Sequence, residues 1–287
     1  MNKAIIATHN GVFHADDVFA VATLNLYFFD TEVVRTRDNA IIEAADWVVD
    51  VGGVYNSSDD RFDHHQKGFK NSRPDGCKYS SFGLVWDKFG DEMCGSPEAA
   101  KIVDDQLVRV VDAVDNGQDE FINGNFGYSD VISGFNPTWN EVADHDLRFN
   151  EAVEFATTIL QNAIRSAKGA VGAKEEVCNG STIYEGRVVV LERFCPWQDF
   201  VITCMPNALF VLFPDVTGDW RIQVVPEESG GFKARKDLPA TWAGLRAEDL
   251  AAVTGCDDAI FCHNGRFIAG ASSKTSVARM AMLALAD

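Results

Sequence analysis

Two short clusters of histidine and aspartate stand out near the start of the chain. One is the triplet 63–65, which reads Asp-His-His, and the other is the segment 9–17, which holds two histidines and two aspartates. Together they contain four of the six histidines of the chain. Neutral imidazole and carboxylate suit hard or borderline divalent metal ions. The two clusters therefore predict a metal centre, and their combined size favours more than one ion.

A centre with two ions needs a carboxylate that can bridge them. Asp50 follows the apolar segment 47–49 and precedes two glycines, so it is well placed for that bridge. Two ions ~3.5–4 Å apart can lower the pKa of a bridging water and hold a phosphoryl oxygen. Asp112 and Asp115 lie near each other on an expected helix, because they are three residues apart. The candidate nitrogen and oxygen ligands are His9, His14, Asp16, Asp50, Asp63, His64, His65 and Asp115.

The segments that carry these residues alternate between strand and helix. Strands are predicted over 3–8, 32–36 and 47–51, and a helix begins at Asp16/Asp17, one of which could serve only the helix dipole. Strands that alternate with helices predict a parallel sheet, whose ligands gather at the carboxyl ends of the strands. His9 and Asp50 both fall at such ends.

The rest of the chain changes character after a long helix. Helices are predicted over 80–89, 97–116 and 144–171, the last of which we expect to end at Gly169, Gly172 and Gly180. Strands are then predicted over 187–191, 208–213, 220–225, 259–261 and 267–269, and a helix over 277–285. We expect an α/β protein with a parallel-sheet N-terminal domain over 1–145, a connecting helix over 146–178 and a smaller α/β C-terminal domain over 179–287.

Composition is that of a soluble globular protein. The 287 residues are 46% hydrophobic and 24% charged, which suits two ordinary domains. We find no apolar run of the ~18 residues that a membrane span needs, and His9 interrupts the first apolar segment too early for a signal peptide. The seven cysteines include no CxxC pair, so we expect buried, reduced thiols rather than disulfides or a zinc ribbon. These features predict a cytoplasmic protein with no membrane partner.

The net charge of −18 repels polyanions at long range, which excludes a general nucleic-acid coating protein. The acids are concentrated in the first half of the chain. That distribution fits a cation-binding first half and a second half that offers local bases, although acidic surface also simply confers solubility.

The order of the candidate ligands resembles that of the DHH phosphoesterase superfamily, which includes RecJ-type nucleases and family II pyrophosphatases. Longer strings are similar to one branch, the melanocyte-proliferating-gene-type family, also called metal-dependent protein hydrolases. These strings are THNGVFHADD at 8–17, VDVGG at 49–53, DHHQ at 63–66, VDAVDNG at 111–117, LPATWAGLR at 238–246 and FCHNGRFIAG at 261–270. The resemblance spans nearly the whole chain. Peptide cleavage is not supported, because the chain has no HExxH helix.

The resemblance implies a DHH-type catalytic domain with two divalent ions, usually Mn²⁺. It implies that one ion is held by His9, His14 and Asp50, and the other by Asp16, Asp50, His64 and Asp115. His65 would lie beside the scissile phosphate as an acid or electrostatic stabiliser, and Asp63 would orient a neighbouring histidine. The superfamily usually has an aspartate where His14 aligns, so Mg²⁺, Zn²⁺ and Fe²⁺ stay open as alternatives.

The C-terminal domain is expected to bind the substrate. Phosphate needs cations and backbone N–H groups, which basic side chains and glycine-rich turns supply. The candidates are Arg221, Arg235, Lys236, His263, Gly265 and Lys274.

These features lead to the hypothesis of a metal-dependent phosphodiesterase, an exonuclease on short single-stranded RNA or DNA. A metal-activated hydroxide would attack phosphorus in line, and His65 or a metal-bound water would protonate the departing oxygen. Two alternatives stay open: a small-molecule phosphoesterase acting on a dinucleotide, a cyclic dinucleotide or pyrophosphate, and a nonenzymatic metal- or nucleotide-binding regulator. The partner is thus a short nucleic acid or a nucleotide, and a homo-oligomer also stays open.

Overall fold

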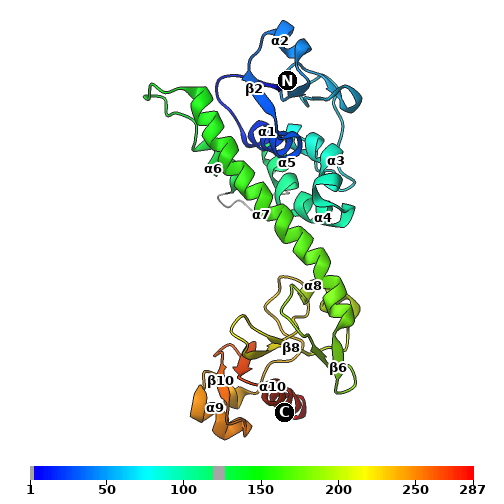
Figure 1. Ribbon diagram of the computed structural model, residues 1–287, viewed down its shortest axis with the longest axis vertical. Helices are drawn as coiled ribbons and strands as arrows, with labels where there is room; N and C mark the ends of the chain where they lie inside the picture. The colour runs from blue at the N-terminus through cyan, green and yellow to red at the C-terminus, as the bar shows by residue number, and fades with distance from the viewer. Residues whose placement is uncertain (1–2, 119–126) are drawn as a thin grey trace. The chain divides into compact units, whose positions relative to one another are not determined.

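The first half of the chain contains a sheet of mainly parallel strands, as the alternation of strands and helices predicted (Figure 1). The structure is a computed structural model that describes residues 3–118 and 127–287. β1 (Ala4–Thr8) pairs in parallel with β2 (Thr31–Arg35) and with β3 (Trp47–Val49). β3 pairs in parallel with β5 (Arg61–Phe62), and β4 (Tyr55–Asn56) pairs with β5 in antiparallel fashion, which gives the order β2-β1-β3-β5-β4.

The third strand is shorter than its apolar pattern suggests. It ends at Val49 instead of continuing to Val51, because Asp50 has a φ of 55° and leaves the extended conformation. This left-handed region is uncommon for residues other than glycine, although aspartate tolerates it better than most. The chain turns at once through Gly52 and Gly53, both of which have positive φ.

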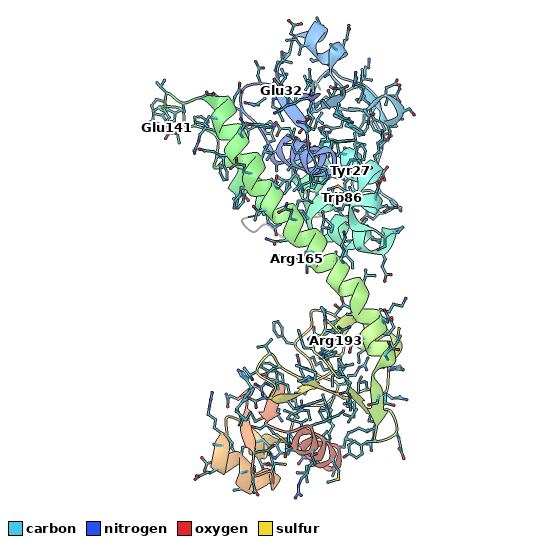
Figure 2. The ribbon with its side chains drawn as sticks, in the orientation of Figure 1. Tyr27, Glu32, Trp86, Glu141, Arg165 and Arg193 are labelled. Atoms are coloured by element: carbon cyan, nitrogen blue, oxygen red, sulfur yellow. The ribbon has the colours of Figure 1, made fainter. Side chains whose placement is uncertain are left out.

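Helices pack on this sheet and on one another. They are α1 (Ala15–Phe28), α2 (Asn39–Ala44), the 3-10 turn η1 (Ser57–Asp59), α3 (Ser81–Cys94), α4 (Pro97–Val103), the π-helical stretch η2 (Asp104–Val108), α5 (Arg109–Asp115) and α6 (Tyr128–Ser133). Phe19 of α1 stacks on Phe82 of α3, with ring centroids 5.2 Å apart. Trp86 of α3, labelled in Figure 2, donates to the carbonyl oxygen of Ala100 in α4 over 3.2 Å.

The predicted helix over 97–116 is thus present, but it contains a π-helical stretch. Such stretches often occur near functional sites, and this one lies directly before the α5 helix that carries Asp112 and Asp115.

The long helix α7 (His145–Asn179) extends further than its glycines predicted. Gly169 and Gly172 lie inside the helix, and only Gly180 follows its end. A glycine costs a helix only about 1 kcal/mol relative to alanine, and the alanine, lysine and glutamate residues around them favour helix. The chain divides into two units, Met1–Lys168 and Gly169–Asp287, so the division falls within α7.

The second unit has a six-stranded sheet in the order β10-β11-β9-β8-β7-β6. Its strands are β6 (Ser181–Ile183), β7 (Val188–Val190), β8 (Phe210–Pro214), β9 (Trp220–Val224), β10 (Ala259–Cys262) and β11 (Ile268–Ala271). Its helices are α8 (Gln198–Cys204), the 3-10 turn η4 (Ala240–Trp242), α9 (Ala247–Thr254) and α10 (Lys274–Ala286). Only the β7–β8 pair is parallel among the described strands of this sheet.

Both faces of this second sheet are covered. Successive side chains of a strand point to opposite faces, and in β7 they enter different apolar clusters. Val188 and Val190 pack with Met280 of α10, whereas Val189 packs with Trp197 next to α8. The sheet is therefore the middle layer of the second unit.

In the described part of the chain, no helix has the length and apolar character needed to cross a membrane. All seven cysteines are free thiols. Five are buried as expected, but Cys178 and Cys204 are exposed.

Candidate metal centre

The candidate ligands of the first unit converge at the carboxyl ends of its parallel strands. His9 follows β1, Asp50 follows β3, and the triplet 63–65 follows β5. Two helices complete the set: α1 supplies His14 at its N-cap and Asp16 in its first turn, and α5 ends at Asp115. Parallel strands bring these distant segments together because their carboxyl ends share one edge.

The six predicted ligands and His65 form three overlapping groups. Within each group, one nitrogen or oxygen atom of each residue lies within 4.8 Å of those of the others. The groups are His9, His14 and Asp50; Asp50, His64 and His65; and Asp16, His64 and Asp115. Asp50 belongs to two groups, and His64 also belongs to two. All six residues predicted as metal ligands therefore lie in one connected cluster.

The two carboxylate oxygens of Asp50 face different histidines. Oδ2 lies 3.3 Å from Nε2 of His9, whereas Oδ1 lies 3.4 Å from Nε2 of His64 and 3.3 Å from Nδ1 of His65. Two ligand atoms that bind one ion at about 2.1 Å in octahedral geometry are about 3 Å apart. These separations are of that size, and the split of the two oxygens is what a bridging carboxylate requires.

His64 lies between two further carboxylates. Its Nε2 atom is 3.7 Å from Oδ2 of Asp16 and 3.3 Å from Oδ2 of Asp115. Asp16 is buried, and the Asp115 side chain is 20% exposed. This half of the cluster is therefore enclosed on the Asp16 side and open on the Asp115 side.

The charges and unpaired atoms of this cluster fit divalent cations. Both carboxylate oxygens of Asp16 and Nε2 of His64 are buried without a hydrogen-bond partner in the described part of the chain. Burial raises the pKa of Asp16 well above its usual range, and repulsion from Asp50 and Asp115 adds to this. Burial likewise raises the pKa of Asp115. A cation would satisfy these atoms and relieve the repulsion, and the mixed imidazole–carboxylate set suits Mn²⁺, Fe²⁺ or Zn²⁺.

Three neighbouring histidines stabilise the ionised form of the Asp50 carboxylate. Burial alone would raise its pKa, but the close approach of His64, His65 and His9 holds the pKa of Asp50 well below its usual range. In return, hydrogen bonds to Asp17 and Asp50 outweigh burial and raise the pKa of His9 to about 10. These contacts thus favour the protonated form of His9 and the ionised form of Asp50.

Asp63 holds His65 rather than joining a ligand group. Its Oδ1 atom accepts hydrogen bonds from the backbone N–H and ring Nδ1 of His65, each 2.9 Å long. Its Oδ2 atom accepts from the backbone N–H of Gly53 over 2.6 Å. Asp63 therefore connects the histidine pair to the turn that follows Asp50. The His65 side chain is 62% exposed, and hydrogen bonds to Asp50 and Asp63 raise its pKa to about 10.

The structure separates the roles of the two adjacent acids at the start of α1. Asp17 accepts from the backbone N–H of His14 over 2.9 Å, which completes a capping interaction, and it lies 3.2 Å from Nε2 of His9. Asp16 lies against His64 instead. Residue type and spacing alone could not assign the capping role to one of the two.

Several polar residues behind and beside the cluster were not anticipated. Ser80 donates to buried Asp112 over 2.5 Å, and Arg73 pairs with Asp112 over 2.7 Å and with Asp104 over 2.5 Å. Asp112 is thus part of the support of α5, while Asp115, three residues later, faces the cluster. No motif marks these serine and arginine side chains, because their role depends on long-range contacts.

A cavity of about 580 Å³ opens on the cluster. Its lining consists of ligand-cluster side chains, the turn after β3 and one arginine: His9, Asn10, Val12, His14, Arg37, Asp50, Val51, Gly52, Gly53, Asp63 and His65. This volume is within the range of small-ligand sites, about 300–1,000 Å³. Arg37 could have been suspected from the sequence, because it lies just beyond the carboxyl end of β2.

The predicted substrate-binding residues of the second unit are spread over several elements. Arg221 lies on β9, where it pairs with Asp215 and stacks on Phe261 with its Cζ atom 5.4 Å from the ring centroid. Lys274 is the first residue of α10; it pairs with Glu192 over 2.7 Å and lies 5.1 Å from the ring centroid of Trp220. Both cationic side chains therefore already have an acidic and an aromatic partner within the protein.

The remaining candidates differ in how many contacts their side chains make within the protein. Arg235 donates to the carbonyl oxygens of Ile202, Met205 and Ala208 over 2.8–3.0 Å, so its guanidinium fixes the end of α8. Lys236 follows it and is partly exposed. In the turn between β10 and β11, exposed His263 accepts from the backbone N–H of Gly265 at Nδ1 over 3.0 Å. These contacts give Arg235 a structural role and leave the turn exposed.

Comparison with known proteins agrees with the family resemblance of the motifs. Residues 5–285 match the family model MYG1_exonuc, described as Uncharacterised protein family (UPF0160). The "MYG1 exonuclease" of Rattus norvegicus is 33% identical over 98% of this chain and 84% of its own length. The MYG1 protein of Saccharomyces cerevisiae is 34% identical over 98% of this chain and 95% of its own length.

A structural match is much more distant. The crystal structure of RecJ in complex with Mn²⁺ from Thermus thermophilus aligns with 99% of this chain and 52% of that chain, at a TM-score of 0.31 and 13% sequence identity. A match at this level supports no conclusion about function. The full-length family match and the identities above 30% establish that the chain belongs to the MYG1 family.

Proposed function

We propose that the chain is a metal-dependent phosphodiesterase that acts as an exonuclease on short single-stranded RNA or DNA. The observation that carries this proposal is the sharing of Asp50, whose two oxygens face His9 on one side and His64 on the other. Relatives that are named MYG1 exonuclease support the reaction class.

The ligand groups suggest how two ions would be held. His9, His14 and Asp50 would hold one, and Asp16, Asp50, His64 and Asp115 the other. Two bound divalent ions, most simply Mn²⁺, would supply Lewis acidity toward a phosphoryl oxygen and a nucleophile at neutral pH. Asp63, which binds none of them in this proposal, fixes the position of His65.

His65 is the proposed proton donor. Its ring lines the cavity and is more than half exposed, so a phosphate in the cavity can reach it. The contact between Nδ1 of His65 and Oδ1 of Asp63, which holds no metal in this proposal, favours the protonated ring. A protonated imidazole can donate a hydrogen bond to a phosphate oxygen and a proton to the departing oxygen.

The second unit would bind the remainder of the substrate. The exposed turn with His263 and Gly265, together with Lys236, is the best-supported part of that proposal, because Arg221, Arg235 and Lys274 have partners in the protein. We also place the protein in the cytoplasm, since seven free thiols suit a reducing compartment.

The test is hydrolysis of a 5′-labelled single-stranded RNA and of a dinucleotide, in Mn²⁺, in Mg²⁺ and in EDTA. Wild type would be compared with Asp50→Asn and with Asp105→Asn, which removes an exposed acid that pairs with Lys101 on α4. We expect stepwise shortening in Mn²⁺ by wild type and Asp105→Asn, and none by Asp50→Asn or in EDTA.

Other outcomes would replace the proposal. Cleavage of the dinucleotide alone would indicate a small-molecule phosphoesterase. Binding of metal without cleavage of either substrate would indicate a regulator. Cleavage that survives both EDTA and Asp50→Asn would show that this cluster is not the active site.

A further inference from the structure

Arg37 lies next to the candidate metal centre, in a stretch of backbone with hydrogen bonds on both sides. The N–H of Thr36 donates to the carbonyl oxygen of Thr8 over 2.7 Å, which ties this stretch to the end of β1. On the other side, Asp38 caps α2 by accepting from the N–H of Ala40 over 2.8 Å. The backbone of Arg37 is therefore held on both sides, while its side chain is exposed.

The neighbouring Arg35, at the same edge of the sheet, has a structural role. Its guanidinium pairs with Asp146 over 2.8 Å, donates to the carbonyl oxygen of Gly11 over 2.7 Å and stacks on Phe149. Arg37 has no comparable hydrogen bond, ion pair or ring contact with any residue in the described ranges. Within residues 3–118 and 127–287, it is thus a cation without a partner.

The position of this free cation is specific. Among the described residues that line the cavity of about 580 Å³, Arg37 is the only arginine or lysine. It shares that lining with Asp50 and Asp63 but forms an ion pair with neither. A guanidinium that stands apart from nearby carboxylates in a cavity is available to an anionic ligand, and its planar fork matches phosphate.

We propose that Arg37 binds a second phosphate of the substrate, the one next along the substrate from the phosphate at the metal centre. The inference rests on the proposed phosphodiesterase function. It narrows the substrate to nucleotides that carry two phosphates, for example an oligonucleotide whose end is phosphorylated. The cluster of His9, Asp50 and His65 receives the reacting phosphate, and Arg37, which contacts none of those side chains, receives its neighbour.

The first test measures binding without turnover. Uridine 3′,5′-bisphosphate and uridine 5′-monophosphate, neither of which has an internucleotide bond, would be titrated into the Mg²⁺-loaded protein by calorimetry. A hydrogen-bonded charge pair changes affinity by about 10- to 100-fold, so wild type is expected to bind the bisphosphate more tightly by that factor. Arg37→Ala should remove this advantage, and Arg37→Lys should keep part of it, because lysine supplies charge but no fork.

The matched control is Lys101→Ala. It removes the same charge from the exposed face of α4, outside the cavity lining, and should leave the advantage of the bisphosphate unchanged. A wild type that binds both ligands equally, or an Arg37→Ala variant that keeps the preference, would overturn the proposal.

The second test separates this proposal from the enzymatic one. With 5′-phosphorylated and 5′-hydroxyl dinucleotides, Arg37→Ala should raise KM for the phosphorylated substrate about 10- to 100-fold while kcat changes little. If wild type cleaves neither the dinucleotides nor the single-stranded RNA but Arg37 still governs bisphosphate binding, the activity is refuted and the phosphate site stands. If wild type cleaves and Arg37→Ala is unchanged in both tests, the activity stands and the phosphate site is refuted.

Discussion

The Ser81 hydroxyl donates to Oδ1 of Asp50 over 2.9 Å, and both side chains are buried. This hydrogen bond comes from the first turn of α3, thirty-one residues further along the chain. It fixes the carboxylate whose oxygens face His9 and His64. The geometry of the candidate bridge therefore depends on a helix that contributes no metal ligand in our proposal.

Ser81→Ala should weaken metal binding. Partners that orient a metal ligand typically change affinity by about 10- to 100-fold when they are removed, and we expect a loss of about 10-fold for Mn²⁺ in calorimetry. Ser80→Ala is the matched control, because the adjacent serine donates to Asp112 instead. It should lower the free energy of unfolding by about 1 kcal/mol with a smaller effect on Mn²⁺ affinity. Equal effects of both variants on affinity would contradict this division.

The metal-free protein should show a pH-dependent contribution of His65 to stability. Hydrogen bonds to Asp50 and Asp63 raise the pKa of His65 from 6.5 to about 10. A raised pKa of a base means that the contribution is fully present below pH 6.5 and is lost as the pH rises through 10. Because the side chain is 62% exposed, solvent screening limits the contribution to about 1 kcal/mol or less.

This expectation is measured by urea unfolding of wild type and His65→Gln in EDTA, from pH 6 to pH 10. The difference in free energy of unfolding should be greatest at the acidic end and should shrink toward the alkaline end. A difference that grows with pH would show that the hydrogen bonds to Asp50 and Asp63 do not favour the protonated ring.

Gly83 in α3 should resist replacement by alanine. A Cβ atom there would lie 2.0 Å from Oδ2 of Asp112, and the Gly83 N–H donates to Oδ1 of the same carboxylate over 3.0 Å. Although alanine favours helix by about 1 kcal/mol over glycine, the buried carboxylate would have to move away from Arg73. We therefore expect Gly83→Ala to lower the melting temperature.

Gly172→Ala provides the control for that substitution. Gly172 lies inside α7, where an added Cβ meets no atom within 4 Å. Here the helix preference acts alone, and we expect a gain of about 0.5–1 kcal/mol. If both variants gained stability in thermal unfolding, the contact between α3 and Asp112 would be looser than the distances indicate.

Much of the fold was predictable because local patterns and sheet topology agree. Apolar strands that alternate with helices predicted the parallel sheet, and the carboxyl ends of its strands carry His9 and Asp50 as expected. The end of β3 at Val49 was not predictable, because nothing in an apolar run indicates that Asp50 takes a left-handed φ. The length of α7 was missed for a different reason, since glycine weakens a helix without necessarily ending it.

The candidate metal ligands were more predictable than the residues around them. Histidine and aspartate at close spacing carry a chemical signal, and the structure brings all six predicted ligands together. The second half of the chain lacks such a signal, so only its charge and its position in a glycine-containing loop predicted Arg235 as a phosphate contact. In the structure, its guanidinium binds the carbonyl oxygens at the end of α8, a contact between segments about thirty residues apart that composition does not indicate.

The most direct test of the dinuclear centre is the number of ions that each chain retains. Wild type and Asp50→Asn would be loaded with Mn²⁺, dialysed, and measured by inductively coupled plasma mass spectrometry against protein concentration. We predict two ions per chain for wild type and a loss of both tightly held ions for Asp50→Asn, because the shared carboxylate belongs to both sites. A wild type that retains none, or an Asp50→Asn variant that still retains two, would contradict the proposal that Asp50 bridges a pair of metal ions.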